Sequence, residues 1–495
     1  CCHSVGGRVK QVQPFKGFAP IDLGGEFIHG SDSIINRTAK ENGWVVQPCY
    51  KCEGLENEYM FYYKGKLHPL LSSHLDIQKA WKAWDDIIFF WEKRSRNDHL
   101  QSAENFHETD QEANVYDSGC KSAEDLQTQP DSVSIKNSGV TKLEETQEMH
   151  CRQSTVNSDL KAPLRDMSIQ EWLERKECDE DVIAVFEAMY CQTIAATPKQ
   201  MGLFESAREE NAWQYGSGNY RLAESYSLLV EHLLNKCAKV DKRLCWQVKE
   251  IDWTGATGQN RERKQDKSNP AGKVCLKNQR GETFTAKYVI ITVPLTVLKD
   301  GDIFFTPALP SSKKKAIDSI EMRGALKIVC RFKSQFWPDN LKLIYSVRGF
   351  VSQIWMYSRD STHSHEKCHL VAGFETAEPA EEKIHLSGQE VLDGFLKHLD
   401  EIFRTDSNPH PASDLYMDYV YYHWSKHPFI RGGYSSPTAH AHGLRDELAR
   451  PVEDRLFFAG EATSVTACAT VHTAMETGFR AAREVCSLAK RVHRK

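Results

Sequence analysis

The stretch Arg455-Leu456-Phe457-Phe458-Ala459-Gly460 decides the fold class of this chain. Its nearly unbroken apolar run is typical of a β-strand that is buried on both faces. Beyond the glycine, apolar residues at helical spacing predict a helix from about Thr470: Val471, Ala474, Met475, Gly478, Phe479, Ala482 and Val485. A buried strand, a glycine turn and a helix in this order are the ordinary construction of a ligand-binding α/β layer. We therefore expect an α/β protein.

A second buried strand is expected over Tyr288-Val289-Ile290-Ile291-Thr292-Val293. Other segments alternate between apolar and polar residues, as exposed antiparallel strands do, at 341–359 and 368–375. Two helices are predicted at 169–190 and 388–403. The chain therefore visits an α/β layer and an antiparallel α+β layer in turn, and the two layers are interleaved in sequence.

Two segments differ in composition from the rest of the chain. Residues 95–161 are rich in Ser, Asn, Gln, Asp, Glu and Thr, which predicts a largely disordered insertion. A mobile hairpin loop is expected at 255–272 between two strands, 244–253 and 273–276. Just before the insertion, Trp81, Trp84, Ile88 and Trp91 are spaced for one face of a helix.

Composition excludes several classes of protein. A chain of 495 residues with 40% hydrophobic side chains is too long and too apolar for a peptide or a wholly disordered protein. Its 63 Lys and Arg against 68 Asp and Glu give a charge of −5, so nucleic-acid binding is not expected. Fifteen cysteines, an odd number, favour reduced thiols and a reducing compartment, and no membrane span or metal site is expected.

Two glycine-rich segments near the start are candidate ligand contacts. In Val5-Gly6-Gly7-Arg8-Val9, the glycines allow close backbone approach and the arginine can form paired hydrogen bonds to a phosphate. The segment Asp22-Leu23-Gly24-Gly25-Glu26-Phe27-Ile28-His29-Gly30 again combines paired glycines with a histidine. Alone, each is more often a structural feature than a ligand contact.

Seven segments in order, however, resemble the flavin-dependent amine oxidases, the superfamily of polyamine oxidases, monoamine oxidases and histone lysine demethylases. They are Val5 to Val9, Asp22 to Gly30, Tyr288 to Pro294, Gly324 to Lys327, Trp424 to Tyr434, Phe457 to Glu461 and Ala469 to His472. The resemblance is strongest to polyamine and spermine oxidases. It implies FAD as cofactor, in a Rossmann-like domain of the GR2 type interleaved with an α+β substrate domain that has an antiparallel sheet. The implied FAD-binding segments are 1–50, 212–300 and 433–495, and the substrate segments are 51–211 and 301–432.

One element of that family is missing. The G-x-G-x-x-G turn, which lies before the Gly-Gly-Arg segment and holds the pyrophosphate at a helix N-terminus, does not occur in this sequence. We expect that the chain is truncated at its start and that, as given, it binds FAD poorly. The alternative is a relative that has lost its phosphate-binding loop.

The resemblance implies a set of site residues. Catalytic roles fall to Lys327, which would hold a water against the flavin, to Trp424 and Tyr434 as an aromatic wall, and to His29 as a hydrogen-bond partner of the substrate nitrogen. Thr470 stands where monoamine oxidases carry a second tyrosine, which leaves room for a long amine. The implied cofactor contacts are Gly7, Arg8, Gly25, Glu26, Phe27, Val248, Gly460, Glu461, Thr470 and Val471, with Glu461 accepting hydrogen bonds from ribityl or ribose hydroxyls.

Each of these residues also has a structural interpretation. Lys327 could point outward from an alternating strand, the two aromatic residues could be core, and Glu461 could be a carboxylate at a helix start. For the carboxylates of residues 205–210 we favour a solvated helix face over pairing with a distal ammonium group.

The sequence thus predicts an FAD-dependent oxidase of amines, with a small amine and O2 as its partners. Polyamines such as spermine, spermidine or their acetylated forms are the expected substrates, oxidised by hydride transfer, imine hydrolysis and release of H2O2. Two alternatives stay open, a lysine demethylase-like oxidase and a catalytically silent binding or scaffold protein. A cytoplasmic location is expected, with nuclear and peroxisomal locations as alternatives.

Overall fold

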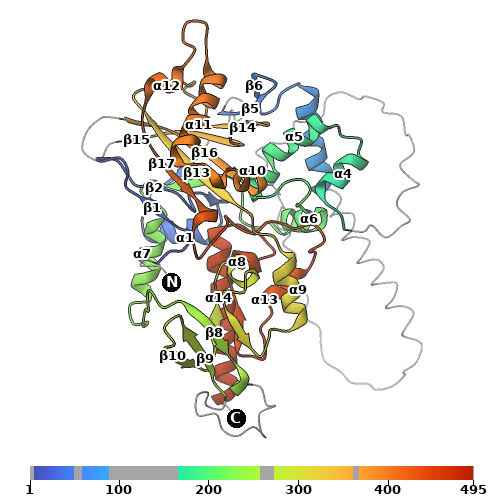
Figure 1. Cartoon of the computed structure of the whole chain (residues 1–495), viewed down its shortest axis with the longest axis vertical. Coiled ribbons are helices and arrows are strands. Elements are labelled where there is room, and N and C mark those ends of the chain that lie inside the picture. Colours follow the sequence, from blue (N-terminus) through green and yellow to red (C-terminus); the bar gives the residue numbers. More distant parts are fainter. Residues whose placement is uncertain (1–4, 50–57, 89–165, 257–271, 361–366, 494–495) are drawn as a thin grey trace, which may run out of the picture.

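A computed structural model describes residues 5–49, 58–88, 166–256, 272–360 and 367–493 (Figure 1). The predicted insertion at 95–161, most of the loop at 255–272, and Trp91 lie outside these residues. The described chain forms an upper part built on a large β-sheet and a lower part built around the long C-terminal helix α14 (Val471–His493).

Seven strands make the large sheet, in the order β17-β13-β16-β15-β14-β5-β6. Its members are β5 (Tyr59–Tyr63), β6 (Lys66–Pro69), β13 (Ala325–Phe332), β14 (Leu343–Ser346), β15 (Gln353–Asp360), β16 (Lys367–Thr376) and β17 (Tyr416–His423). Neighbours are antiparallel except β14 and β5, which are parallel. The predicted antiparallel sheet is therefore confirmed, with one parallel junction.

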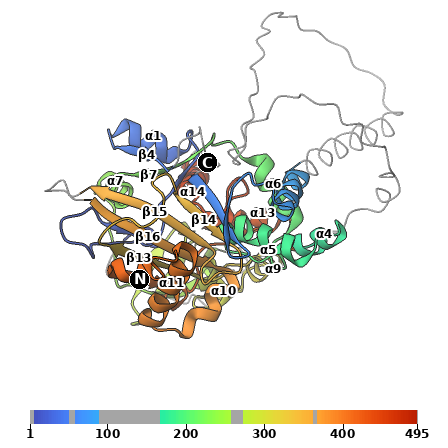
Figure 2. The same cartoon turned by 90° about the horizontal axis from the view of Figure 1, so that it is seen from above.

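The expectation that these strands have one exposed face is wrong, because both faces of the sheet are covered. Helix α11 (Gly388–Phe403) begins at a capping box formed by Ser387 and Glu390, and packs Phe395 and Leu399 with Ile328 and Ile354. On the other face, residues of the N-terminal segment pack against the central strands: Phe15, Ile21 and Leu23 join Val329, Leu370 and Ala372. Figure 2 shows α11 against the sheet.

A group of helices lies beside the sheet in Figure 2: α4 (Ile169–Arg175), α5 (Glu180–Met189), α6 (Leu203–Ala212) and the helical residues 75–88. Their core includes Trp84, Phe186 and Leu203. The single helix predicted at 169–190 is two helices, because Glu177 adopts a left-handed backbone (φ 57°) and Asp179 caps α5.

The lower part contains the predicted α/β layer. Strand β11 (Val289–Ile291) runs parallel to β18 (Leu456–Phe458), and β18 leads through η6 (Glu461–Thr463) towards α14. The expectation that β11 is buried on both faces is wrong, because Ile290 is 39% exposed. The predicted hairpin forms a four-stranded sheet, in the order β10 (Thr283–Ala286), β9 (Val274–Asn278), β8 (Val248–Asp252) and β12 (Phe304–Thr306).

The helix predicted from Thr470 is confirmed as α14, but its buried face differs from the predicted stripe. The face turned to the protein interior carries His472, Thr473, Thr477 and Ala481. In contrast, Phe479 is 45% exposed. Val471 and Ala474 of the predicted stripe line a cavity instead.

Smaller elements complete the fold. Two small sheets consist of β1 (Gln11–Val12) with β2 (Ile21–Asp22), and of β3 (Ile28–His29), β7 (Asn219–Leu222) and β4 (Val46–Pro48). The remaining helices are α1 (Ile34–Glu41), α7 (Ser227–Lys236), α8 (Leu295–Lys299), α9 (Ser311–Ser319), α10 (Ala377–Glu382), α12 (Pro411–Leu415) and α13 (Leu444–Ala449). Short 3-10 turns are η2 (Cys191–Ile194), η3 (Thr254–Ala256), η4 (Lys383–His385) and η5 (Trp424–Lys426).

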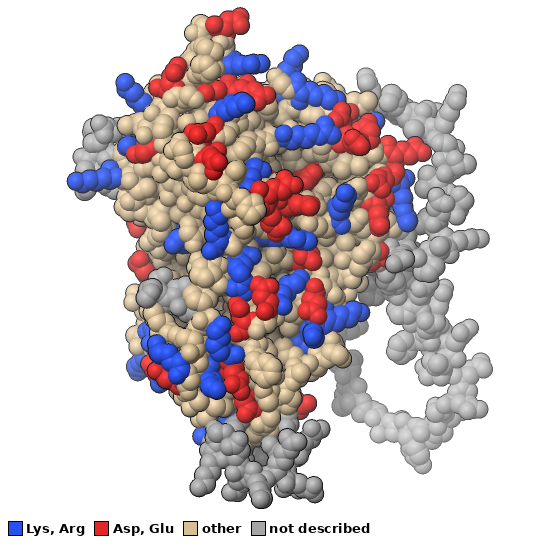
Figure 3. Space-filling model, in the orientation of Figure 1, with Lys and Arg blue, Asp and Glu red and all other residues tan. Residues whose placement is uncertain are grey.

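Both charge signs are mixed over the face seen in Figure 3. Within the described residues, no helix combines the length and the apolar character needed to cross a membrane.

Candidate active site

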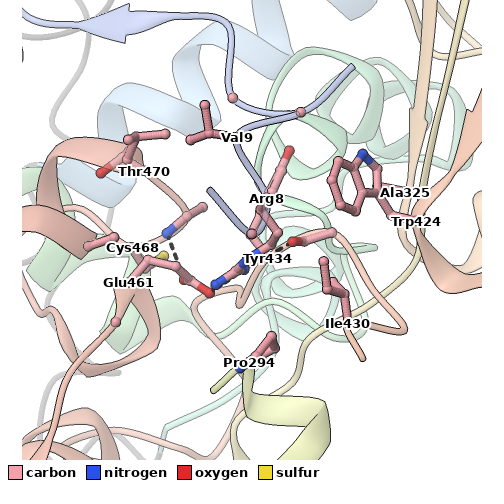
Figure 4. Close-up of a pocket in the computed structure, with 18 of the residues that line it drawn as sticks. Arg8, Val9, Pro294, Ala325, Trp424, Ile430, Tyr434, Glu461, Cys468 and Thr470 are labelled. Carbon is pink, nitrogen blue, oxygen red and sulfur yellow. Dashed lines mark hydrogen bonds and ion pairs between the residues drawn. The ribbon is translucent and has the colours of Figure 1, made fainter. Parts of the chain in front are cut away.

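A cavity of about 1340 Å³ lies between the large sheet, the helical group and the α/β layer. Every predicted site residue lines it: Gly7, Arg8, Gly25, Glu26, Phe27, His29, Val248, Lys327, Trp424, Tyr434, Gly460, Glu461, Thr470 and Val471. Figure 4 shows part of this lining. The structure thus brings together residues that are more than 450 positions apart in the chain, while the role of each one stays a prediction.

The paired glycines allow a close approach between segments of the chain. A Cβ atom on Gly24 would lie 1.8 Å from the carbonyl oxygen of Arg8. The Gly25 amide donates to that same oxygen at 3.1 Å, and a Cβ on Gly25 would meet Val471 at 2.7 Å. The glycines thus allow three segments of the cavity wall to meet, while the predicted approach to a ligand stays a prediction.

Arg8 and Glu461 form an ion pair in the cavity wall (Figure 4). Arg8 Nη1 lies 2.8 Å from Glu461 Oε1 and also donates to the Gly433 carbonyl at 3.0 Å. Glu461 further accepts from the Ser435 hydroxyl at 2.6 Å and from the Ala469 amide at 3.1 Å. Burial raises the pKa of Glu461, but Arg8, Ser435 and Arg445 lower it more, so the net pKa lies below its ordinary value.

This arrangement differs from the predicted one. Both oxygens of Glu461 already accept hydrogen bonds from the chain, so the carboxylate acts first by fixing Arg8. The prediction that Glu461 accepts hydrogen bonds from ligand hydroxyls did not foresee its bonds to Arg8 and Ser435. Arg8 thus presents a fixed positive charge at its part of the cavity wall.

Lys327 lies in the middle of β13, and its side chain is only 7% exposed. Its ammonium donates to the Asp22 carbonyl at 2.7 Å and to the carboxylate of Glu26. The outward-pointing alternative is therefore wrong. Sequence reasoning missed a further neighbour, Arg221 in β7, whose Nε lies 3.0 Å from Glu26 Oε1.

The two predicted aromatic residues use their polar atoms for the chain itself. Trp424 donates its indole N–H to the Leu23 carbonyl at 2.9 Å, and Tyr434 donates its hydroxyl to the Thr193 carbonyl at 2.9 Å. Burial raises the pKa of Tyr434, which keeps it a neutral phenol. Their apolar surfaces therefore face the cavity with fixed ring positions.

His29 lines the cavity with one ring nitrogen engaged. Its Nδ1 lies 2.7 Å from the side-chain oxygen of Asn219. Burial lowers the pKa of His29, which favours the neutral ring. When Asn219 accepts from Nδ1–H, Nε2 keeps a lone pair and is able to accept a hydrogen bond.

Residues near Gly460 complete the α/β side of the cavity. Gly460 has φ 125°, a conformation that favours glycine, and it connects β18 to η6. Thr470 turns its hydroxyl to the Ala467 carbonyl at 3.1 Å and to Thr473 at 2.8 Å. Val248 starts β8 and pairs with Asn278.

The prediction of a solvated helix face at 205–210 is wrong. Glu205 is 4% exposed and accepts from the Gly443 amide at 2.9 Å. Glu209 and Glu210 line the cavity. Burial raises the pKa of Glu209 to about 6, although Arg445 and a hydrogen bond from Cys468 lower it. Glu210 accepts from the Tyr190 hydroxyl at 3.3 Å.

The same wall contains aromatic residues that the sequence analysis assigned to a helix face or did not consider: Trp81, Trp84, Tyr190 and Trp213. Acidic residues next to aromatic ones give a surface suited to an organic cation. The helical spacing of Trp81 and Trp84 indicated burial, but it did not indicate that they border a cavity.

Comparison with known proteins defines the class. A protein-family model described as flavin-containing amine oxidoreductase matches residues 3–486, and the chain belongs to this family. Curated relatives include polyamine oxidases and lysine demethylases, and FAD is the cofactor of the class. The prediction of the family, of its cofactor and of its α/β fold is confirmed.

Particular relatives show how far the likeness extends. Peroxisomal N(1)-acetyl-spermine/spermidine oxidase from Homo sapiens is 29% identical over 265 residues, which cover 49% of this chain and 50% of the relative. Lysine-specific histone demethylase 1B from Mus musculus is 27% identical over 284 residues, 55% of this chain and 31% of the relative. The chain thus spans half or less of the length of these curated relatives.

Solved structures share the fold over nearly the whole chain. Cyclohexylamine oxidase from Brevibacterium oxydans IH-35A aligns with a TM-score of 0.68 at 16% identity, covering 99% of this chain and 92% of that one. A putrescine oxidase bound to putrescine aligns with a TM-score of 0.66 at 14% identity, covering 98% and 92%.

The described residues offer several contacts suited to a flavin dinucleotide, whereas the G-x-G-x-x-G turn that holds the pyrophosphate in this family does not occur in the sequence. The cavity exceeds the roughly 300–1000 Å³ that small-molecule sites usually have, so it can hold a large cofactor together with a substrate. Ile290 is 39% exposed and lines this cavity, which offers apolar surface to a ligand. Arg8, fixed by Glu461, supplies a cation for a phosphate.

Proposed function

We propose that this protein oxidises polyamines with FAD and O2. The observation that carries the substrate class is the wall formed by α6, where Glu209 and Glu210 line the same cavity as Lys327. A polyamine has several ammonium groups. One of them must lose its proton for oxidation, while the others need anionic or aromatic partners.

The chain's own residues have distinct tasks in this proposal. Trp424 and Tyr434, with their polar atoms bonded to the backbone, hold the amine by ring contacts and exclude water from the C–N bond. Neutral His29 is suited to accept a hydrogen bond or a proton from the substrate nitrogen through Nε2. Bound FAD supplies the two-electron acceptor for the carbon next to that nitrogen.

The balance of the reaction is simple. The amine loses a hydride from the carbon and a proton from the nitrogen and becomes an imine, which water hydrolyses to an aldehyde and a shorter amine. The two electrons and two protons end on O2 as H2O2. Buried Lys327, held by the Asp22 carbonyl and Glu26, offers a fixed cation at the cavity wall.

The relatives support both an oxidase of polyamines and a second candidate. Polyamine oxidase 3 from Oryza sativa subsp. japonica is 31% identical over 206 residues, and a lysine-specific histone demethylase homolog from the same plant is 31% identical over 217 residues. The demethylase-like activity would use a methylated lysine side chain as the amine. Its peptide brings only one ammonium group to the oxidised end, whereas two cavity carboxylates favour a polyamine.

A peroxide assay on the FAD-loaded protein separates these functions. Its substrates are spermine, spermidine, N1-acetylspermine, and histone peptides with monomethyl- or dimethyl-lysine. We expect H2O2 with at least one polyamine and none with the peptides. Peroxide from the peptides alone would support the demethylase-like function. A protein that binds FAD but forms no peroxide with any of these amines would contradict the proposal and support a silent binding role.

Two variants control the assay. Lys327→Met removes the cavity cation, and we expect it to slow turnover severely while the bound flavin keeps a similar visible spectrum. Glu484→Gln, on the outer part of α14, removes a carboxylate far from the cavity lining, and we expect unchanged peroxide formation.

A further inference from the structure

A buried cluster of two cations and one anion borders the cavity: Lys327 and Glu26 line it, and Arg221 pairs with Glu26. We propose that Glu26 and Arg221 are positioning residues that hold the side chain of Lys327 at the cavity wall as an ammonium ion. The inference uses the proposed function only for its effect on turnover, because the charge state of a lysine can be measured without substrate.

Glu26 is the direct partner of Lys327. The ammonium contacts one carboxylate oxygen of Glu26 and donates to the Asp22 carbonyl at 2.7 Å. The side chains of Lys327 and Glu26 are 7% and 4% exposed, so water screens this pair very little. A buried ammonium keeps its proton only when an anion or several acceptors compensate for lost hydration.

Arg221 fixes the other oxygen of Glu26. Its Nε lies 3.0 Å from Glu26 Oε1, and its side chain is 14% exposed. The guanidinium plane lies over the rings of Phe27 and Tyr357, each with 4.6 Å between the guanidinium carbon and the ring centre. Contacts with these rings and the ion pair with Glu26 together hold the guanidinium beside the carboxylate, on the side away from the lysine's contact with the second oxygen.

The other groups around the cluster do not replace Glu26. Asp22 is the nearby carboxylate, and it accepts from the Ser225 hydroxyl at 2.7 Å and from the Tyr226 amide. Burial raises the pKa of the Cys49 thiol to about 12, so it brings no charge. Among the described residues, Tyr357 and Tyr59 are further titratable groups close enough to act on Arg221.

Removal of the anion therefore has a defined consequence. Without Glu26, Lys327 would share its buried site with the cation of Arg221, and both burial and repulsion favour the neutral amine. A neutral amine reacts with an acylating reagent, whereas an ammonium ion does not. Because Lys327 lines the cavity, a small reagent is able to reach it.

The experiment compares wild type with Glu26→Gln, which keeps the shape of the side chain and removes its charge. Acetic anhydride labels the cofactor-free protein at a series of pH values, and mass spectrometry of the Lys327 peptide gives the rate. At pH 8 we expect labelling at least about tenfold faster in Glu26→Gln, because loss of the carboxylate leaves buried Lys327 beside the cation of Arg221. Glu26→Asp, which restores a carboxylate, should return most of the protection.

Two further variants keep the test decisive. Glu484→Gln is the matched control, and its Lys327 should label at the wild-type rate. Arg221→Lys keeps the charge but loses the guanidinium that contacts the rings of Phe27 and Tyr357, and we expect a labelling rate between those of wild type and Glu26→Gln. It also gives an answer if Glu26→Gln does not fold, which thermal melting of each variant will show.

A second readout uses the FAD-loaded enzyme. In Glu26→Gln we expect slower turnover than in wild type, and Glu26→Asp should restore most of it. Equal labelling rates in folded wild type, Glu26→Gln and Arg221→Lys would overturn the inference, whatever the enzyme's substrate. Fast labelling in the Glu26 variant, together with no amine oxidation by the FAD-loaded wild-type protein, would leave this inference standing and reject the proposed function.

Discussion

Replacement of Glu461 by glutamine tests how much one buried carboxylate in the cavity wall contributes to the stability of the protein and to its affinity for FAD. The change keeps the size of the side chain and removes a charge that is 4% exposed and 2.8 Å from Arg8. The loss of one partner of a buried ion pair usually costs about 3–5 kcal/mol. Arg8 is 26% exposed, so part of its charge regains hydration, and the lower end of this range, about 3 kcal/mol, is expected.

Hydrogen-bond geometry adds to this cost. Glu461 Oε2 accepts from the Ser435 hydroxyl and from the Ala469 amide. In Glu461→Gln one acceptor oxygen becomes an NH2 donor, which cannot satisfy the donors that faced it. With Arg8 less well fixed, the affinity for FAD should also fall.

The assay is chemical denaturation of wild type, Glu461→Gln and the control Glu484→Gln. The control breaks a surface pair with Arg480, at 3.1 Å, and should cost less than about 1 kcal/mol. Because the pKa of Glu461 is lowered in the folded protein, its stabilisation is present above the ordinary pKa of 4.5 and is lost as pH falls through the folded value. A Glu461→Gln protein as stable as the control at pH 7 would refute this reasoning.

Three further substitutions give separate tests. Burial raises the pKa of Glu209 to about 6, so its charged form destabilises the wild-type protein above pH 6. Glu209→Gln removes this buried charge and should be more stable than wild type above pH 6 by about 1–2 kcal/mol. Melting temperatures without this gain would contradict the prediction. The same variant should raise KM for spermine. Lys313 donates to three carbonyl oxygens at the end of α13. Lys313→Met should therefore lower the free energy of unfolding, measured by denaturant titration, by about 2–4 kcal/mol. A decrease below about 1 kcal/mol would contradict this prediction. Gly24→Ala places a Cβ 1.8 Å from the Arg8 carbonyl oxygen, so the cavity wall must shift. A titration followed by flavin fluorescence should show that the affinity for FAD falls at least about 100-fold, which equals about 3 kcal/mol. An affinity equal to that of wild type would disprove the steric argument.

The sequence predicted much of the fold because buried strands and helices have periodic apolar patterns. The strand at β18 and the helix α14 lie where the pattern placed them. The pattern failed where apolar residues face a cavity. Val471, Ala474 and Ile290 line the cavity, and a hydrophobic sequence does not distinguish that surface from the protein core.

The site shows a similar division. The paired glycines and the single charge of Lys327 within an apolar strand are short local patterns, so they could be recognised in the sequence. Arg221 was not found and Glu209 was assigned to a solvated helix face, because their surroundings depend on partners distant in sequence: Glu26 for the first and Cys468 for the second. No local spacing encodes such contacts, which arise only when β7 and α6 pack beside other segments. The predicted domain boundaries and the residue roles stay predictions.

The central claim is that one cavity holds a flavin and an amine in position for oxidation. The most direct measurement is an anaerobic titration of the FAD-loaded protein with spermine, followed by visible absorbance. The account predicts that the flavin colour bleaches with saturation in spermine, and that air restores it with release of H2O2. A tightly bound flavin that keeps its full colour in the presence of spermine, spermidine and N1-acetylspermine would contradict it.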